Sequence, residues 1–417
     1  MDFITYFKNW LVISAENSPY NILNMLNNDC IEEVFRRVKN VTDFLNMAQV
    51  CQRFQNCAKN CFRTQIRCIK INGKDSSVPL ERVQELFDLF GPLMQSITFE
   101  STFDVEQDDY IFGLITNACG ETLAELSIID YNPNFGDQMP FKELKTLDMC
   151  RISPQNFRLV TTLNTLRIRD LRRFQDGRSL DDALSDLLSS NTQLQELVVN
   201  CCGSPSIFRV IAKCAPNLVN LTVETPHFDA FPQKHVKENL LHLGTLRQLR
   251  SLKLDLYCFI SLASIVNLFA KNGIAIEKLS MKVCSVGPLK YHNEQWLSLK
   301  ALKQLDILTW SDDVCIDELV NVMKKQTTLE RMEIVSLRAL NMSGIENILK
   351  YGKNLNQLVA SISVLNVDLK SYESVLNLAR NRANVKIGFG CGKVYVPDDI
   401  LEKNRNWLDI QKNTKRP

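Results

Sequence analysis

The pattern Leu-x-x-Leu-x-Leu, with other aliphatic residues allowed at the leucine positions, recurs along most of this 417-residue chain. Copies begin at Met94, Leu123, Leu144, Leu163, Leu194, Leu218, Leu249, Ile276, Leu302, Leu329 and Leu355, with a weaker copy at Arg382. An earlier, irregular strand is expected in the segment that starts at Cys61. The copies recur about every 26 residues, and self-similarity at such a period indicates stacked repeats, because one repeat cannot bury its apolar side alone.

The segments between the copies carry apolar residues at helical spacing. Ile207, Val210 and Ile211 share one helical face, as do Leu262 and Ile265 in a later segment. Each repeat is therefore predicted to be a strand followed by a helix. The repeats resemble the leucine-rich-repeat family, and their length resembles its ribonuclease-inhibitor-like class. The resemblance implies an α/β solenoid over residues 66–395, with a curved parallel sheet on the concave face and helices on the convex face.

The predicted strands define an outward-facing surface, because leucine positions point into the core and the positions between them point out. That surface mixes both charges with a few aromatic residues, which is typical of protein binding. The candidate binding residues on it are Arg167, Arg169, Glu196, Lys253, Asp255, Tyr257, Lys282, Trp310 and Arg331. Arg167 and Arg169 fit two interpretations, recognition of an acidic peptide or a solvated surface paired with interleaved aspartates.

Residues 22–65 do not fit the repeat and are expected to form three short helices. The first follows Asn27 or Asn28, the second is capped by Thr42, and the third follows Val50. The apolar positions of the three helices are Ile31, Val34, Phe35, Val38, Phe44, Leu45, Ala48, Phe54, Ala58 and Cys61. Helices of this length bury a marginal core, so the module needs stabilisation by a partner or by the solenoid.

Four short strings in this module carry a second resemblance. They are Leu26-Asn27-Asn28-Asp29, Val34-Phe35, Asp43-Phe44-Leu45 and Val50-Cys51-Gln52-Arg53-Phe54. In this order they resemble an F-box, the adaptor-binding motif of SCF-type ubiquitin ligases. Family members open with Leu-Pro, and Asn27 stands in place of the proline. An F-box followed by leucine-rich repeats is itself a known family architecture.

The resemblance implies a substrate-recognition subunit of an SCF (Skp–cullin–F-box) ligase. The residues implied to bind a Skp-family adaptor, and through it a cullin, are Leu26, Ile31, Val34, Phe35, Leu45, Val50 and Phe54. The outward surface of the solenoid would bind an unknown protein substrate, and the chemistry would lie in other subunits. A second interpretation stays open, in which Asn27 marks a degenerate F-box and the chain is a non-catalytic interaction scaffold outside ubiquitination.

The segments that flank the repeats are expected to cover their ends. A helix is predicted from Leu80 to Phe90, where Gly91-Pro92 stops it. Residues 1–21 form an N-terminal extension, and residues 396–417 form a C-terminal cap and tail. The glycine-rich string Gly388–Gly392 is interpreted as a tight turn that ends the last repeat, because it lacks the lysine pattern of a phosphate-binding loop.

Neither a metal site nor a catalytic constellation is indicated. Cys51, Cys57, Cys61 and Cys68 cluster in sequence, but they lack metal-ligand spacing and a nearby histidine, so core thiols are expected. No Ser/Cys–His arrangement or phosphate loop accompanies them. We therefore expect no cofactor, no metal and no enzymatic activity.

Charge and hydropathy argue against nucleic-acid binding, membrane insertion and secretion. The formal net charge of +2 gives no general reason to bind nucleic acid or an anionic membrane. The longest charge-free apolar stretch, Leu256–Ala270, is 15 residues long and too short to span a bilayer. The first residues lack the basic and small-residue features of a secretion signal, so the cytoplasm or the nucleus is the expected location.

Overall fold

A computed structural model describes most of the chain, which forms two compact units, unit 1 (Met1–Leu163) and unit 2 (Asn164–Pro417). The described residues are 26–72, 76–131, 133, 141–151, 162–171, 180–201, 206–225, 233–256, 262–283, 299–309, 319–320, 323–324, 326–336, 342–361, 374–375, 377–378, 386–390 and 408–411. The predicted N-terminal extension, residues 1–21, lies outside them.

Unit 1 begins with three helices, α3 (Asn28–Arg37), α4 (Val41–Ala48) and α5 (Gln52–Gln65). The first two helices both pack against α5. The prediction that Thr42 caps the second helix is wrong. Asn40 is the cap, because its side chain accepts a hydrogen bond from the backbone N–H of Asp43 at 3.1 Å, and α4 begins at the next residue.

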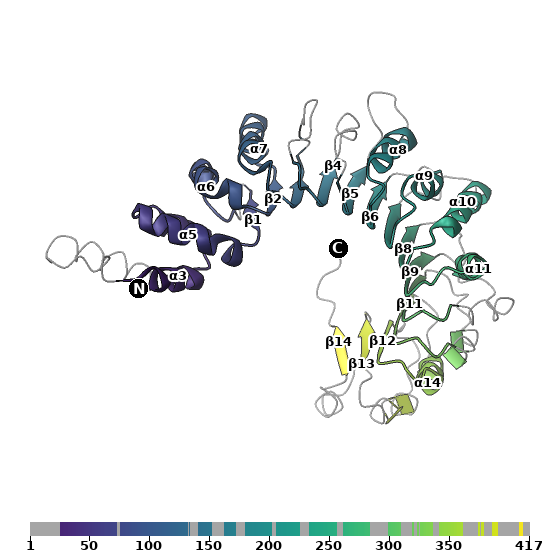
Figure 1. Ribbon diagram of the computed structural model, residues 1–417. Coiled ribbons are helices and arrows are strands. Elements are labelled where there is room, and N and C mark those ends of the chain that lie inside the picture. The colour runs from purple at the N-terminus through teal and green to yellow at the C-terminus, as the bar shows by residue number, and fades with distance from the viewer. Residues whose placement is uncertain are drawn as a thin grey trace. The chain divides into compact units, whose positions relative to one another are not determined.

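The rest of unit 1 consists of strands, with helices between the first three of them (Figure 1). In chain order these are β1 (Ile69–Ile71), η1 (Leu80–Arg82), α6 (Val83–Phe90), η2 (Gly91–Leu93), β2 (Ser96–Glu100), α7 (Val105–Cys119), β3 (Glu125–Ile129) and β4 (Thr146–Arg151). The strands pair in parallel in sequence order. The apolar side chains of β2 alternate as the sequence predicts, since Ile97 and Phe99 are buried while their neighbours are partly exposed.

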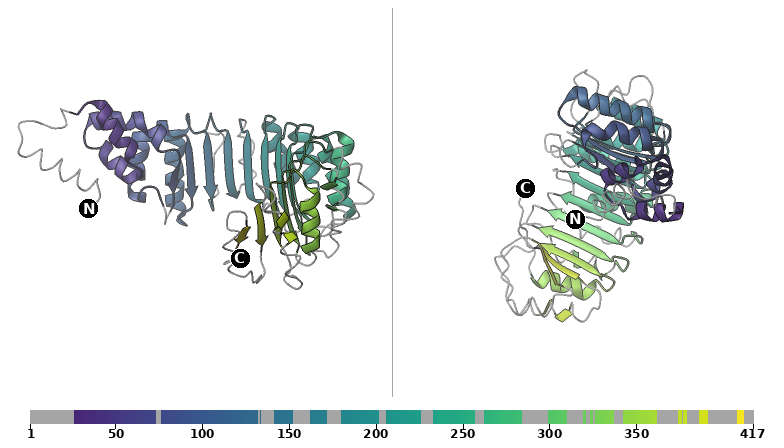
Figure 2. Two further views of the ribbon diagram at one scale, coloured as in Figure 1. Left: turned by 90° about the horizontal axis from the view of Figure 1, so that it is seen from below. Right: turned by 90° about the vertical axis from the view of Figure 1, so that its left-hand side faces the viewer.

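Unit 2 continues the same alternation, with helices along the outer side of its curved sheet (Figures 1 and 2). Its strands are β5 (Thr165–Leu171), β6 (Glu196–Cys201), β7 (Asn220–Thr225), β8 (Ser251–Leu256), β9 (Lys278–Val283), β10 (Gln304–Thr309), β11 (Arg331–Ser336), β12 (Gln357–Ser361), β13 (Lys386–Gly390) and β14 (Leu408–Gln411). Its helices are α8 (Leu180–Ser190), α9 (Ile207–Cys214), α10 (Gln233–Leu240), η5 (Leu241–Thr245), α11 (Leu262–Asn272) and α14 (Met342–Tyr351).

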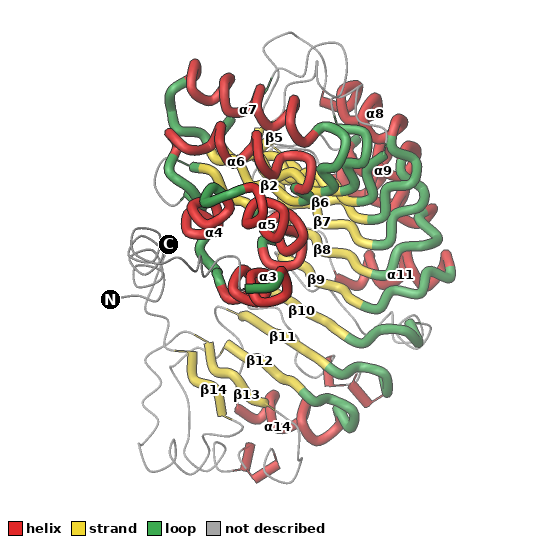
Figure 3. The backbone as a smooth tube through the Cα atoms, turned by 60° about the vertical axis from the view of Figure 1, so that its left-hand side comes forward, coloured by secondary structure: helices red, strands yellow, loops and turns green. Residues whose placement is uncertain are grey.

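The strands of unit 2 run side by side (Figure 3) and pair in parallel, and their leucines are register partners across neighbouring strands. Leu221 of β7 pairs with Leu197 of β6 and with Leu252 of β8, and all three are buried. Stacking of identical positions converts the sequence repeat into one continuous row of core side chains. The predicted leucine-rich-repeat solenoid of the ribonuclease-inhibitor-like strand–helix type is therefore confirmed as the fold.

Polar side chains link several repeats to their predecessors in both units. Thr122 and Thr328 donate hydrogen bonds to the backbone carbonyls of Met94 and Leu302, at 3.2 and 2.8 Å. The amide of the buried Gln326 donates to the carbonyl of Leu299 at 2.6 Å. Such bonds pair carbonyls that the turns would otherwise leave unsatisfied inside the stack.

One expectation for the C-terminal end is wrong, and a second gains a structural detail. Gly388, Phe389 and Gly390 do not form a turn, because they lie in β13 and pair with Val359, Ala360 and Ser361 of β12. The predicted cap and tail, residues 396–417, contributes a further strand, β14, which pairs with β13. The other residues of that tail lie outside the described residues, and so do Cys391 and Gly392 of the glycine-rich string.

Candidate functional site

The first turn of α3 is held by a residue from the start of α5. The guanidinium of Arg53 donates to the side-chain oxygen of Asn28 at 2.7 Å and also to the backbone carbonyl of Leu26. Asn27 caps the helix by accepting a hydrogen bond from the N–H of Cys30 at 2.9 Å. The turn that replaces the Leu-Pro step is therefore fixed by its own cap and by an arginine of the Val50–Phe54 string.

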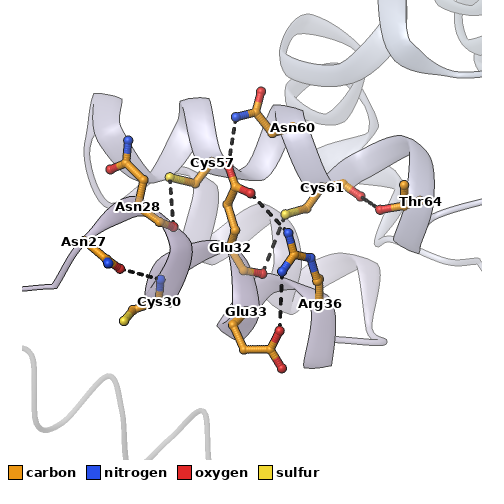
Figure 4. A network of polar contacts seen from close by, with 10 residues as sticks. All are labelled: Asn27, Asn28, Cys30, Glu32, Glu33, Arg36, Cys57, Asn60, Cys61 and Thr64. Carbon is orange, nitrogen blue, oxygen red and sulfur yellow. Dashed lines mark hydrogen bonds and ion pairs between the residues drawn. The ribbon is translucent and has the colours of Figure 1, made fainter.

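A second set of polar contacts joins α3 to α5 along their length (Figure 4). Asn60 donates to the carboxylate of Glu32 at 2.9 Å, and the same carboxylate pairs with Arg36 at 3.3 Å. The thiol of Cys61 lies 3.6 Å from the backbone carbonyl of Glu32. Because the contacts of Asn60 and Cys61 with Glu32 join residues 28 and 29 apart in sequence, they fix the two helices relative to one another.

The cysteines of this module divide by burial. Cys57 and Cys61 are buried, as the sequence predicts, and burial raises the pKa of both thiols. Cys51 and Cys68 are exposed, so the expectation that they are core thiols is wrong, because Cys51 is the residue before α5 and Cys68 precedes β1. Among the described residues, no group of His, Cys, Asp and Glu is arranged to hold a metal ion.

The seven residues implied to bind an adaptor separate into a core and a surface group. Ile31, Phe35, Leu45 and Phe54 are at most 2% exposed and form the core of the helices. The surface group consists of Val50, which is 45% exposed, with Leu26 and Val34, which are partly exposed. A partner that docks on this preformed module would therefore contact the second group, while the first group keeps the helices in place.

Aromatic rings join the module to the first repeat of unit 1. The ring of Phe62 on α5 stacks on that of Phe90 on α6, with centroids 4.4 Å apart and planes at 4°. Phe44 of α4 contacts the same Phe90 ring at 5.8 Å and lies 4.8 Å from Phe35 of α3. All four rings are buried. The sequence predicts that a partner or the solenoid stabilises the module, but it does not identify Phe90 as the contact, because Phe90 reads equally well as a core residue of the capping helix.

Arg82 adds a polar link beside these rings. Its guanidinium donates to the side chains of Asn46 and Gln49 near the end of α4, at 2.6 and 3.0 Å, and pairs with Glu85 at 2.9 Å. The hydrogen bond from Gln49, ahead of that from Arg82, lowers the pKa of Glu85. The three N-terminal helices and α6 therefore share one apolar core, and the polar network of Arg82 links the end of α4 to α6.

The described candidate binding residues on the sheet of unit 2 are all at least partly exposed, and four of them pair with one another. Arg167 of β5 makes an ion pair with Glu196 of β6 at 2.8 Å. Lys282 of β9 pairs with Asp255 of β8 at 3.1 Å, between residues that are register partners. Arg169 is exposed. A ligand that uses these charges must compete with pairs that already exist on the surface.

Two more of the predicted charges are paired within the sheet. Lys253 of β8 pairs with Glu224 of β7 at 2.7 Å, and Arg331 pairs with Glu333 on the same strand at 3.2 Å. These are solvent-accessible pairs, each of which contributes about 0–1 kcal/mol to stability. The remaining two candidates, Tyr257 and Trp310, lie outside the described residues.

Asp306 of β10 is the outward residue whose environment is most unusual. Its Oδ2 accepts a hydrogen bond from Gln304 at 2.6 Å, whereas its Oδ1 is buried and has no hydrogen-bond partner among the described residues. Burial raises the pKa of Asp306, and the nearby Glu333 raises it further, against the opposing effects of Gln304 and Arg331. An outward carboxylate with an open acceptor atom is suited to receive a donor from a bound protein.

Comparisons with known proteins find solved structures that are similar to the chain at low sequence identity. No family model matches the chain, and no curated protein matches it. Among solved structures, a complex of Rad7 and Elc1 from yeast matches with a TM-score of 0.47 and 14% identity, over 94% of this chain and 91% of the matched one. The leucine-rich repeat-containing protein LegL7 from Legionella pneumophila matches with a TM-score of 0.38 and 13% identity, over 73% and 92%.

No helix among the described residues is both long enough and apolar enough to cross a bilayer.

Proposed function

We propose that this chain is the substrate-recognition subunit of an SCF (Skp–cullin–F-box) ubiquitin ligase. The observation that supports the proposal best is the hydrogen bonding of Arg53. It connects the two ends of the F-box-like motif, since the arginine of Val50–Phe54 holds the Leu26–Asn28 turn. Residues that are distant in sequence and share one motif are thereby in direct contact.

The proposed adaptor surface consists of the exposed apolar residues of the module. Leu26, Val34 and Val50 would contact a Skp-family adaptor, and the buried Phe35 and Leu45 would hold their helices in the docking geometry. Apolar side chains of this size on a rigid helical surface contribute binding energy without a large ordering cost. The adaptor would in turn link the chain to a cullin.

Unit 2 would hold the protein substrate on the outward face of its sheet. The chain itself would act without catalytic residues, metal or cofactor, because it raises the effective concentration of substrate near the ubiquitin-transfer subunits. A bound substrate would have to replace ion pairs such as Lys282–Asp255 with its own charges. Recognition would therefore depend on the charge pattern of the substrate. Such a complex would act in the cytoplasm or the nucleus.

Asn27 supports one alternative, a scaffold whose F-box has degenerated and which does not act in ubiquitination. Two features of Asn27 weigh against it. Its φ of −76° lies within the range that proline adopts, and its side chain supplies the N-terminal cap of α3. The turn geometry is thus compatible with the family's Leu-Pro step, although the residue differs.

The test is co-purification of the full-length chain with a Skp-family adaptor from cells. Wild-type protein is expected to capture the adaptor, and Val50→Asp or Val34→Asp is expected to abolish capture, because each change places a charge on the apolar surface. Leu45→Asp is unsuitable as a test, because Leu45 is fully buried and the variant would unfold the module.

A matched control separates docking from solubility effects. Leu241→Asp introduces the same charge at an exposed apolar position of unit 2, where Leu241 is 62% exposed, and is expected to leave adaptor capture unchanged. Failure of the wild-type protein to bind any Skp-family adaptor would support the scaffold alternative. Substrate abundance that rises when the chain is removed would support the ligase role.

A further inference from the structure

The loop between β2 and α7 in unit 1 presents an aromatic side chain to solvent. Phe103 is 84% exposed, and Val105 at the start of α7 is 71% exposed. A single exposed apolar residue is ordinary on a protein surface. Two exposed apolar residues close together, Phe103 and Val105, indicate binding only with a second observation. The backbone conformation of Phe103 is that observation.

Phe103 has a φ of +67°, in the left-handed region. For a bulky residue that conformation is disfavoured, because its Cβ approaches the neighbouring backbone oxygen. Strain of this kind persists only where the surrounding structure imposes it, and it is concentrated at functional positions. Glycine would occupy the position without strain, so the side chain of Phe103 is retained against a local cost.

The surrounding loop imposes this conformation through a complete set of hydrogen bonds. The buried carboxylate of Asp108 accepts hydrogen bonds from the hydroxyl of Ser101 at 2.6 Å and from the N–H and hydroxyl of Thr102, both at 2.8 Å. The N–H of Phe103 donates to the hydroxyl of Ser101 at 3.0 Å. Asp104 then caps α7 by accepting from the N–H of Gln107 at 3.2 Å.

This arrangement is a rigid support for one exposed ring. A buried carboxylate with three hydrogen bonds holds its partners firmly, because breaking any of the bonds leaves a buried polar group unpaired. The backbone that carries the ring therefore has little conformational entropy to lose on binding, as is expected of an interface anchor.

The charge around the ring defines the chemistry of the partner. Residues 96–131 contain eight acidic residues and no lysine or arginine. Glu100 and Glu121 pair with Lys70 and Lys142, and Asp108 is buried, so the negative charge near the ring comes from the exposed carboxylates beside it. Asp104, Glu106 and Asp109 are exposed beside the apolar pair. An anionic membrane would be repelled by these carboxylates, whereas a protein pocket with basic residues at its rim would be complementary.

We propose that the β2–α7 loop is an anchor for a partner protein that offers an apolar pocket rimmed by lysine and arginine. Phe103 inserts into the pocket, Val105 covers its edge, and the carboxylates of Asp104 and Glu106 meet the basic rim. The proposal does not rest on the F-box-like module, because all of these residues belong to the repeats.

The first experiment identifies the occupant by its contact with this position. The full-length chain is expressed in cells with the photo-crosslinking residue p-benzoylphenylalanine at position 103, and in parallel at the control position Leu241. A discrete protein adduct that forms at 103 and not at 241 is expected. It should persist in the Val50→Asp variant, whereas loss of the adduct in that variant would overturn the proposal by assigning the loop to the adaptor interface.

The second experiment measures binding of the crosslinked protein, purified, to the purified full-length chain. Phe103→Gly is expected to weaken the affinity at least about 10-fold, the loss typical of an aromatic anchor. Glu106→Lys should also weaken it and reduce its salt dependence, and Leu241→Ala should not change it. An affinity that Phe103→Gly leaves within about twofold of wild type would overturn the proposal.

Two further readouts separate anchoring from folding and from membrane binding. Phe103→Gly is expected to raise the unfolding temperature of unit 1, because glycine relieves the left-handed strain while binding is lost. A lower unfolding temperature would contradict the strain on which the argument depends. Flotation of the wild-type chain with phosphatidylcholine–phosphatidylserine vesicles, lost in Phe103→Gly, would instead assign the ring to a lipid surface and overturn the proposal.

Discussion

Asn27 shows how a departure from a motif can preserve the geometry that the motif provides. The residue has the φ of a proline, and its side chain satisfies the N–H of Cys30 at the start of α3. The sequence identifies Asn27 or Asn28 as the cap, because both are favoured at that position. Only the structure distinguishes them, since Asn28 instead accepts a hydrogen bond from Arg53, which lies 25 residues later in the chain.

Asn27→Ala is expected to destabilise the first turn of α3 by about 1 kcal/mol, because the N–H of Cys30 loses its acceptor. Asn27→Asp, which keeps an acceptor at the same place, is expected to retain most of the wild-type stability. Hydrogen exchange of the Cys30 amide measures the difference. Equal protection in the alanine and aspartate variants would show that the cap does not stabilise the turn.

The sequence predicts the outward position of Asp306 but not its raised pKa. The repeat places Asp306 outward because it lies between Leu305 and Ile307, both of which are buried. Its raised pKa follows from burial and from Glu333 on the next strand. Neither is visible in the sequence, because the degree of burial depends on how neighbouring side chains lie across the sheet.

The raised pKa of Asp306 predicts a pH-dependent stability of unit 2. Ionisation costs more in the folded than in the unfolded state, so Asp306 lowers stability as pH rises from its ordinary pKa of 3.8 through the higher folded value. Asp306→Asn removes this effect. Its unfolding temperature is expected to exceed that of the wild type at pH 7 and to converge with it below pH 3.8, as thermal unfolding across this range would measure.

At the scale of elements, the periodic pattern predicts most of what the structure contains. Each leucine-rich copy from Met94 onward became a strand, because burial of alternate apolar residues leaves few other arrangements. The string from Gly388 was misassigned, because glycines indicate turns in isolation while the strands on either side impose β structure here. Pairing between neighbouring strands thus outweighed local propensity.

The apolar core of the F-box-like module extends beyond the boundary that the sequence predicts for the module. Residues 22–65 form a recognisable segment in sequence, but Phe44 and Phe62 are covered by Phe90 of α6. The isolated segment would expose both rings and lose the Arg82 network. Sequence analysis anticipates a marginal core, whereas the identity of the stabilising helix depends on packing between elements.

A segment of residues 22–65 produced alone is therefore expected to be largely unfolded. A segment of residues 22–163 is expected to fold, because it keeps α6 and the repeats of unit 1. Circular dichroism and amide proton dispersion compare the two segments directly. Cooperative unfolding of the 22–65 segment alone would show that its own core is sufficient.

At the scale of the whole molecule, the repeats divide into two compact units. Phe90 lies in the core of unit 1, and Leu305 lies in the core of unit 2. The sequence shows a shorter and more variable repeat spacing from Met94 to Leu194 than from Leu249 to Leu355. It does not show where one compact unit ends, because the leucine pattern continues across Leu163.

Two core variants are expected to act on different thermal transitions of the full-length chain. Phe90→Ala removes a buried ring and is expected to destabilise unit 1 by about 3–5 kcal/mol, and Leu305→Ala is expected to destabilise unit 2 by about 2–5 kcal/mol. Differential scanning calorimetry should show each variant shifting one transition only. A single transition that both variants shift equally would indicate one cooperative unit.

The proposed role depends on whether the exposed face of the N-terminal helices binds an adaptor directly. Isothermal titration of the purified full-length chain with a purified Skp-family adaptor tests this. We predict saturable one-to-one binding that Val50→Asp abolishes and that Leu241→Asp leaves unchanged. Absence of binding by a folded wild-type chain, or equal binding by the Val50→Asp variant, would contradict the assignment of this chain to an SCF ligase.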